Sequence, residues 1–327
     1  MEQVALVLGA SGGVGGEVAR ALVTRGWQVR ALVRGAAPDI GGVAWIRGDA
    51  AVRADVIAAA KGAALIVHAV NPPGYRDWNR LVLPMIDNTI AAARASGARI
   101  LLPGTIYNYG EGCVQPLTET TPQLPSTRKG AIRVELEARL RAAAGDGVRV
   151  LIVRAGDFFG PRPGNNWFSQ GLVKPGAPVR AVTYPGKEGV GHAWAYLPDL
   201  ADTMVRLAEQ ERRLGVFESV HFRGHWDADG TGMVAAIRRV AGGDAMAVRR
   251  FAWWALVLLS PFVALFREMA EVRYLWREPF ELDNAKLLRL LDTETHTPLD
   301  EAVARTLDGL GCTKAAMVTG NLAMLKK

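Results

Sequence analysis

Residues 4–16 read Val4-Ala-Leu-Val-Leu8-Gly9-Ala-Ser-Gly12-Gly-Val-Gly15-Gly16, an apolar run that passes into a glycine-rich turn and then into a helical stretch closed by Gly26. In this order the first glycine permits a tight turn, the second lets a pyrophosphate approach the backbone, and the third lets the helix pack on the strand. The helix N-terminus then faces the negative charge. The segment therefore predicts a dinucleotide-binding turn. The residues expected to contact the dinucleotide are Gly9, Ser11, Gly12, Gly13, Val14 and Gly15.

The end of the second strand, Gln28 to Val33, is expected to meet the ribose of the dinucleotide. An NAD-binding domain usually offers an acid here, about 20 residues beyond the glycines, whereas this chain has Arg34. A guanidinium suits a 2'-phosphate in a bidentate manner, so NADP(H) is predicted ahead of NAD(H). Asp39 lies close enough in the sequence to keep NAD(H) as an alternative. A solvated arginine at a strand end is the other interpretation of Arg34.

Short apolar runs alternate with alanine-rich helical stretches through the first half of the chain, which is typical of repeated strand-helix-strand units around a parallel sheet. The fold class predicted is α/β, a Rossmann-type doubly wound parallel sheet. The expected strands are Val4 to Leu8, Gln28 to Val33, Ala44 to Ile46, Leu65 to Ala69, Ile100 to Leu102 and Val148 to Val153. The expected helices are Val14 to Arg25, Ala54 to Ala60, Trp78 to Ala95 and Gly130 to Ala144.

After Arg154 the sequence becomes rich in glycine, proline and aromatic residues. We expect residues 1–155 to form the dinucleotide-binding domain. Residues 156–327 are expected to form mainly a smaller, mostly helical substrate-binding cap, with some segments returning to the sheet. One helix of this part is predicted to begin near Asp199, and another near Thr297, which with Pro298 would supply an N-cap and a first-turn proline.

Composition excludes several classes of protein. The formal charge is +7 for 327 residues, but the arginines are interleaved with acids, so no nucleic-acid partner is expected. Cys113 and Cys312 lie far apart with no Cys/His cluster, so neither a metal site nor a disulfide framework is predicted. The run Val4 to Leu8 is too short for a secretory signal, and a cytoplasmic location is the simplest expectation.

The apolar run Phe251 to Phe266 is flanked by Arg249, Arg250 and Arg267. It holds about 16 residues and is broken by Ser260 and Pro261, short of the roughly 20 that a transmembrane helix needs. A buried or pocket-lining helix is the favoured interpretation. Peripheral contact with a membrane surface stays open, because aromatic and basic residues meet in this run.

The opening segment, together with Gly48-Asp49-Ala50 after the third strand and Val67-His68-Ala69-Val70 ending the fourth, resembles the short-chain dehydrogenase/reductase superfamily. The similarity is to its extended branch, the NAD-dependent epimerase/dehydratase family, and covers essentially the whole chain. The resemblance implies that Asp49 contacts the adenine and that Ala69, Val70 and Asn71 line the cofactor. A surface turn is the alternative role for Asp49.

The segment Pro103-Gly-Thr105-Ile-Tyr107-Asn-Tyr109-Gly110 resembles the family's serine-rich strand end followed by Tyr-Gly. The resemblance implies that Thr105 takes the catalytic serine or threonine position and that Tyr109 belongs to the catalytic group. A plain strand-end threonine is the alternative. Leu151 to Gly160 resembles the family's nicotinamide-side loop. Tyr196-Leu-Pro-Asp199 resembles a helix start at which Asp199 would be the N-cap.

The chain departs from the family at the helix expected to carry Tyr-x-x-x-Lys, where Ser126 takes the tyrosine position and Gly130 the lysine position. In that pair the lysine and the cofactor's charge lower the tyrosine pKa, which makes the phenol a usable general acid or base. A serine hydroxyl is too weak an acid to replace it. Lys129, one residue out of register beside Arg128, is a candidate catalytic residue. A solvated basic start to the helix is the alternative for it.

A replacement acid or base could come from elsewhere in the chain. The candidates are Tyr107, Tyr109, Tyr184, Tyr196 and His192. A lone histidine near aromatic residues is more often a hydrogen-bonded packing residue.

The leading functional hypothesis is an NADP(H)-binding oxidoreductase or epimerase/dehydratase-like enzyme that acts on an unidentified small molecule through an atypical active site. The alternative is a non-catalytic NADP(H)-binding sensor or regulatory protein, which the departure at Ser126 and Gly130 favours. A weaker third hypothesis is peripheral action on a lipidic substrate. The family resemblance also implies a homodimer formed through the helices Trp78 to Ala95 and Gly130 to Ala144.

Overall fold

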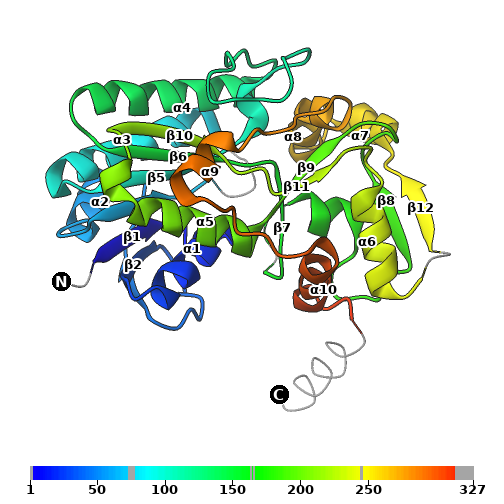
Figure 1. Ribbon diagram of the computed structural model, residues 1–327, viewed down its shortest axis with the longest axis horizontal. Helices are drawn as coiled ribbons and strands as arrows, with labels where there is room; N and C mark the ends of the chain where they lie inside the picture. Colours follow the sequence, from blue (N-terminus) through cyan, green and yellow to red (C-terminus); the bar gives the residue numbers. More distant parts are fainter. Residues whose placement is uncertain (1–2, 73–77, 163, 165, 244–245, 314–327) are drawn as a thin grey trace. The chain divides into compact units, whose positions relative to one another are not determined.

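The computed structural model describes residues 3–72, 78–162, 164, 166–243 and 246–313. It divides into two compact units (Figure 1). Unit 1 comprises the chain to Ala155, Leu200–Phe222 and Asp283–Thr295. Unit 2 comprises Gly156–Asp199, Arg223–Leu282 and the described residues from His296 on.

Unit 1 is built on a seven-stranded parallel sheet in the order β10-β6-β5-β4-β1-β2-β3. The strands are β1 (Val4–Leu8), β2 (Gln28–Val33), β3 (Val43–Arg47), β4 (Leu65–His68), β5 (Arg99–Gly104), β6 (Val150–Arg154) and β10 (Phe217–His221). The six strands expected from the sequence and the Rossmann-type fold are confirmed, with ends displaced by one or two residues. The strand order reverses between β1 and β4, and ligands of such sheets bind at the carboxyl ends of the strands at that point.

Helices cover both faces of this sheet, with α2, α3 and α4 on one face and α1 and α5 on the other (Figure 1). The helices of unit 1 are α1 (Gly13–Thr24), α2 (Arg53–Ala59), α3 (Trp78–Ser96), α4 (Arg128–Gly145), α5 (Leu197–Glu209, whose first turn belongs to unit 2) and α9 (Ala285–Leu291), with short 3-10 turns at Ile106–Asn108 (η2) and Glu211–Arg213 (η4). Both faces of the sheet are therefore buried, and this is why the strands read as almost continuous apolar runs.

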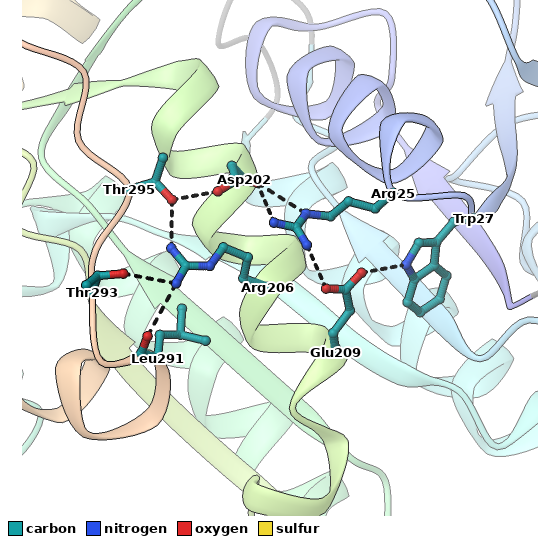
Figure 2. A network of polar contacts seen from close by, with 8 residues as sticks. All are labelled: Arg25, Trp27, Asp202, Arg206, Glu209, Leu291, Thr293 and Thr295. Carbon is teal, nitrogen blue, oxygen red and sulfur yellow. Dashed lines mark hydrogen bonds and ion pairs between the residues drawn. The ribbon is translucent and has the colours of Figure 1, made fainter.

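A polar network fixes the carboxyl end of α1, the helix that follows the glycine turn (Figure 2). Arg25 donates to Asp202 of α5 at 2.9 Å and to Glu209 at 3.0 Å. Thr295 donates its hydroxyl to Asp202 at 2.6 Å and accepts from Arg206 at 2.9 Å. The network joins α1, α5 and the segment 291–295, which are far apart in the sequence, and so holds the orientation of α1.

Unit 2 contains a three-stranded sheet, β11-β9-β7, and a two-stranded sheet, β12-β8. The strands are β7 (Asp157–Phe159), β8 (Ala181–Tyr184), β9 (His192–Tyr196), β11 (His225–Asp227) and β12 (Ala247–Arg250). The other elements are α6 (Gly232–Ala241), α7 (Trp253–Leu259), α8 (Ala264–Glu271), α10 (Leu299–Gly309), a π-helical turn at Phe168–Leu172 (η3) and a 3-10 turn at Arg273–Trp276 (η5). Several of these strands have only three or four residues, too few for a periodic pattern.

The sequence predicted Asp199 as the N-cap of α5, and this prediction is wrong. Asp199 lies buried in the first turn of that helix, and its carboxylate accepts from the Thr297 N–H at 2.6 Å and the Thr297 hydroxyl at 2.7 Å. The prediction of Thr297 as the N-cap of α10 is also wrong, because that helix begins at Leu299 with Pro298 as its N-cap. The hydroxyl of Thr297 is committed to Asp199 instead.

The apolar run Phe251 to Phe266 does not form one buried helix, so that part of the expectation for it is wrong. It divides at Ser260 and Pro261 into α7 and α8, and the side chain that α7 buries is Leu256. One face of α7 packs on the rest of unit 2, where Trp253 is half-buried, whereas Trp254, Val257, Leu258 and Leu259 are exposed. In the part of the chain that the structure describes, no helix has the length and apolar character required to cross a bilayer.

Candidate active site

The glycine turn between β1 and α1 brings three backbone segments into close contact. Gly9 has φ of 88°, and a methyl group on it would lie 2.5 Å from the carbonyl oxygen of Ala69. A methyl group on Gly15 would lie 2.2 Å from the carbonyl oxygen of Gly9. Only glycine is compatible with both positions, the first for the left-handed turn and the other for helix packing.

The middle glycine of the motif, Gly12, is in a different environment. A methyl group there would meet a single neighbouring atom, the carbonyl oxygen of Gly9 at 3.3 Å. Gly12 is exposed and is the N-cap of α1, where it offers no side chain to the first turn. The first-turn N–H groups of a helix have no intrahelical partner and carry partial positive charge. The turn therefore has the shape and polarity of a cradle for a pyrophosphate.

Arg34 and Asp49, both predicted to contact the cofactor, lie together beyond β2 and β3. Their side chains approach to 3.9 Å, and the Arg34 side chain is 62% exposed. Asp49 also accepts the Ala51 N–H at 2.9 Å, so the expected surface turn is present as well. An exposed pair of this kind holds its partners weakly, and the guanidinium stays accessible to an anionic group. Asp39 lies exposed in the loop after β2.

The end of β4 carries the three residues expected to line the cofactor. Ala69 and Val70 are half-buried, and the exposed Asn71 accepts from Arg133 of α4 at 2.9 Å. Just before them, burial lowers the pKa of His68 to about 3, with a smaller effect from Arg133. The hydroxyl of Thr89 donates to a backbone carbonyl, so the 2.8 Å contact between His68 and Thr89 is a donation from the imidazole Nδ1.

Lys129 is not a solvated residue at the helix start, so that alternative is wrong for it. Its side chain is buried, and its ammonium lies 5.9 Å from the ring centroid of Trp78. Arg133, one turn later, is also buried and lies 4.9 Å from the same ring. Arg128, by contrast, is exposed. One face of α4 thus carries two buried cations beside an aromatic ring and the end of β4.

The residues at the two positions of the Tyr-x-x-x-Lys pair, Ser126 and Gly130, both contact backbone atoms. Ser126 is exposed, and its hydroxyl oxygen accepts the Glu111 N–H at 3.0 Å. A methyl group on Gly130 would lie 2.2 Å from the carbonyl oxygen of Tyr107 and 2.7 Å from Pro125. None of the six tyrosines of the chain is followed four residues later by lysine.

A buried ion pair, which sequence reasoning missed, lies beneath the loop that carries Thr105 and Tyr109. Arg154, at the end of β6, donates to Glu137 of α4 at 2.8 Å and to the Thr105 carbonyl at 2.5 Å. Glu137 also accepts from Asn108 at 3.0 Å. An arginine that ends an otherwise apolar strand was the available signal, because a buried guanidinium requires a partner.

Tyr109 lies over this ion pair and is 1% exposed. The Arg154 guanidinium is 5.3 Å from its ring centroid. Burial raises the pKa of Tyr109, and the charge of Arg154 only partly opposes that effect. Thr105 is half-buried, and its hydroxyl donates to Asn108 over a long distance of 3.4 Å.

The other candidate acids and bases differ in exposure. Tyr107 is half-buried in η2, whereas Tyr184 and Tyr196 of unit 2 are buried. Burial raises the pKa of Tyr184. His192 contacts Asp157 at 2.9 Å and stacks on Trp276, with 3.9 Å between ring centroids. Its contacts are those of a packing residue.

The chain is similar in sequence to a known protein family and to a bacterial relative. The model of the family described as "NAD dependent epimerase/dehydratase family" matches residues 5–220. A relative from Sinorhizobium fredii, named "Uncharacterized protein y4nL", is 29% identical over 237 residues. That match spans 64% of this chain and 65% of the relative's own length, which is less than two thirds of that protein.

Solved structures share the fold at low sequence identity. MoeE5, in complex with UDP-glucose and NAD, has a TM-score of 0.73 at 18% identity and covers 94% of this chain and 98% of its own. WbmH from Bordetella bronchiseptica, in complex with NAD+, has a TM-score of 0.69 at 18% identity and covers 94% and 97%. UDP-glucose 4-epimerase from Bifidobacterium longum, in complex with NAD+ and UDP, has a TM-score of 0.72 at 14% identity and covers 98% and 99%.

Proposed function

The chain belongs to the NAD dependent epimerase/dehydratase family, and from this premise we propose that it is an NADP(H)-binding oxidoreductase or epimerase/dehydratase-like enzyme acting on a small molecule. The observation that carries the proposal is the glycine turn. Gly9 and Gly15 are packed so closely that neither accepts a side chain, while Gly12 is exposed at the N-terminus of α1. This arrangement suits a pyrophosphate against the backbone.

The preference for NADP(H) rests on Arg34. Its guanidinium follows β2 directly and is exposed, as a group that pairs with a 2'-phosphate must be. Asp49 is proposed to contact the adenine, with its position fixed by the turn at Ala51. A dianionic phosphate competes well with a single carboxylate for the guanidinium, so the contact between Arg34 and Asp49 leaves room for the cofactor.

We place the chemistry at the end of β5. The nicotinamide, when bound, supplies hydride transfer. Thr105 is proposed to donate its hydroxyl to a substrate oxygen, because its present bond to Asn108 is long and is therefore easily exchanged. Lys129 is proposed to reach the cofactor ribose or a substrate anion from the buried face of α4.

The two tyrosines of the same loop are proposed to divide the remaining work. Tyr107 is the half-buried phenol and is the better placed to exchange a proton with a substrate. Tyr109 is the fully buried one, and its pKa is raised, so we assign it the role of holding the loop over Arg154.

The test is single-turnover spectroscopy of the purified chain with NADP+ or NAD+ and a panel of nucleoside diphosphate sugars that includes UDP-glucose and UDP-glucuronic acid. If the chain is such an enzyme, we expect absorbance of reduced nicotinamide or a new sugar product with at least one compound. Thr105→Ala is expected to abolish this signal while the affinity for the dinucleotide is unchanged. Tyr107→Phe is expected to reduce the rate more than Tyr109→Phe when both variants are equally folded.

A second candidate function, a non-catalytic NADP(H)-binding sensor, is favoured by one observation. Ser126 and Gly130 are packed against backbone at the positions expected for the catalytic pair. If the chain is a sensor, we expect it to bind the dinucleotide without hydride exchange. We also expect it to have a protein partner whose affinity changes when NADPH is added. An identical set of partners with and without NADPH would count against it.

A further inference from the structure

Unit 2 exposes an apolar surface along α7 and the turn that leads into α8. We call this surface the apolar ridge. It consists of Trp254, Val257, Leu258, Leu259, Phe262 and Val263. Phe262 is 85% exposed, Trp254 is 74% exposed and Leu258 is 67% exposed. Six of the twelve exposed large hydrophobic side chains among the described residues fall within these ten positions. Such clustering marks an interaction surface, since single exposed apolar residues are ordinary.

The opposite face of α7 is anchored to unit 2. Leu256 is buried, and the indole N–H of Trp253 donates to the carbonyl of Pro185 at 2.7 Å. The Trp253 ring packs against Phe251 and Trp167, with centroids 4.8 and 5.7 Å away. The ridge is therefore held outward by a fixed aromatic base.

The charges nearest the ridge in the sequence are cationic on both sides. They are Arg249, Arg250 and Arg267, and the first acid that follows them is Glu268. All three arginines are exposed. Apolar and aromatic side chains framed by cations are the pattern of a surface that enters the headgroup region of a bilayer containing anionic lipid.

Two other roles of the apolar ridge are disfavoured, namely spanning a bilayer and contact with a second copy of the chain. The ridge cannot span a bilayer, because α7 has 7 residues and α8 has 8. A second copy of the chain on a twofold axis would present the same surface to itself. Arg249, Arg250 and Arg267 of both copies would then border one interface, and like charges brought together there are unfavourable.

We propose that the apolar ridge docks this protein on the surface of membranes that contain anionic phospholipid. Phe262, Leu258 and Trp254 enter the interfacial layer, and the flanking arginines contact phosphate groups. The docking does not depend on the dinucleotide site, since it concerns other residues of the chain.

The test is flotation of the full chain with vesicles of phosphatidylcholine containing phosphatidylglycerol, and with vesicles of phosphatidylcholine alone. We expect flotation with the anionic vesicles, which weakens as salt is added. The double variant Leu258→Ser/Phe262→Ser is expected to reduce partitioning by at least about tenfold. The matched control is Val114→Ser/Leu124→Ser, which removes two exposed apolar side chains of unit 1. It is expected to float like the wild type.

Three results would overturn the proposal. The first is failure of the wild type to float with the anionic vesicles. The second is equal flotation of the ridge variant and the wild type. The third is self-association in size-exclusion chromatography that the ridge variant abolishes, without any vesicle binding by the wild type. That last result would assign the ridge to contacts between copies of the chain.

Discussion

Gly130 lies so close to the carbonyl oxygen of Tyr107 that a methyl group on it would meet that oxygen at 2.2 Å. The contact joins the start of α4 to the loop at the end of β5, where Thr105 is found. A lysine side chain at position 130 would need the same space. Replacing Gly130 with lysine is therefore not a simple way to restore a Tyr-x-x-x-Lys pair.

Gly130→Ala is predicted to destabilise the protein by about 1–3 kcal/mol, since the added methyl group overpacks a backbone contact. The measurement is the free energy of unfolding from urea titration. The control is Gly145→Ala at the end of the same helix, where a methyl group would meet nothing within 4 Å. That change is expected to be neutral or slightly stabilising. Equal stability of the two variants would contradict the contact with Tyr107.

Glu137→Gln is predicted to cost roughly 3–5 kcal/mol of unfolding free energy, because it leaves the buried charge of Arg154 uncompensated. Urea denaturation again gives the value. Glu135→Gln on the same helix is the control, since its ion pair with Arg139 is exposed and contributes little. A cost for Glu137→Gln no larger than that of the control would show that Arg154 has another counter-ion.

Acid is predicted to destabilise the protein through three buried histidines. Burial lowers the pKa of His68 and of His221 to about 3 and that of His225 to about 4. Histidines of the unfolded chain have a pKa of about 6.5. At pH values between the folded-state and unfolded-state pKa, the unfolded chain therefore binds more protons than the native state. Stability is full above about pH 6.5 and falls as the pH drops toward 3, by up to about 1.4 kcal/mol per pH unit for each histidine.

The measurement is the unfolding free energy of wild type, His68→Gln and the control His296→Gln at several pH values from neutral to acidic. His296 is exposed, and its charge has a smaller effect than burial on the lowered pKa of His225, so its removal is expected to leave most of the pH dependence unchanged. His68→Gln is expected to reduce the slope in this range. A slope unaffected by His68→Gln would mean that this imidazole is protonated in the folded state.

Arg34→Ala is predicted to weaken NADPH binding by at least about tenfold while NADH binding changes little, because a bidentate contact to the 2'-phosphate is lost. Parallel calorimetric titrations with both nucleotides measure the change. Arg30→Ala is a suitable control, since Arg30 belongs to the same strand and donates to the Lys61 carbonyl. An equal loss for NADPH and NADH would assign Arg34 a role unrelated to the phosphate.

Local pattern was sufficient to predict six of the seven strands of the main sheet. The strands β1, β2 and β4 are apolar runs bounded by turn residues, and the glycine turn set the order of the first strand and helix. β10 was not identified, because it joins the sheet beside β6 from far along the chain. The short strands of unit 2 leave no periodic signal.

The candidate site was predictable where one segment decides it and not where distant segments meet. The packing of Gly9 against Ala69 follows from a motif with known spacing. The burial of Lys129 depends on Trp78, and the contact of Asp199 with Thr297 joins residues 98 positions apart. Such contacts are set by tertiary packing, which a single sequence does not display.

The most direct test of the dinucleotide site compares Gly12→Ala with Gly41→Ala in titrations with NADPH. A methyl group at Gly12 would contact one atom at 3.3 Å, which a small shift of the backbone relieves, and one at Gly41 would contact nothing within 4 Å. Both variants should therefore fold. We predict that Gly12→Ala loses NADPH binding, because the methyl group occupies the place of the pyrophosphate, while Gly41→Ala binds like the wild type. NADPH binding retained by Gly12→Ala, or absent from the wild type, would contradict the assignment of the glycine turn as the dinucleotide site.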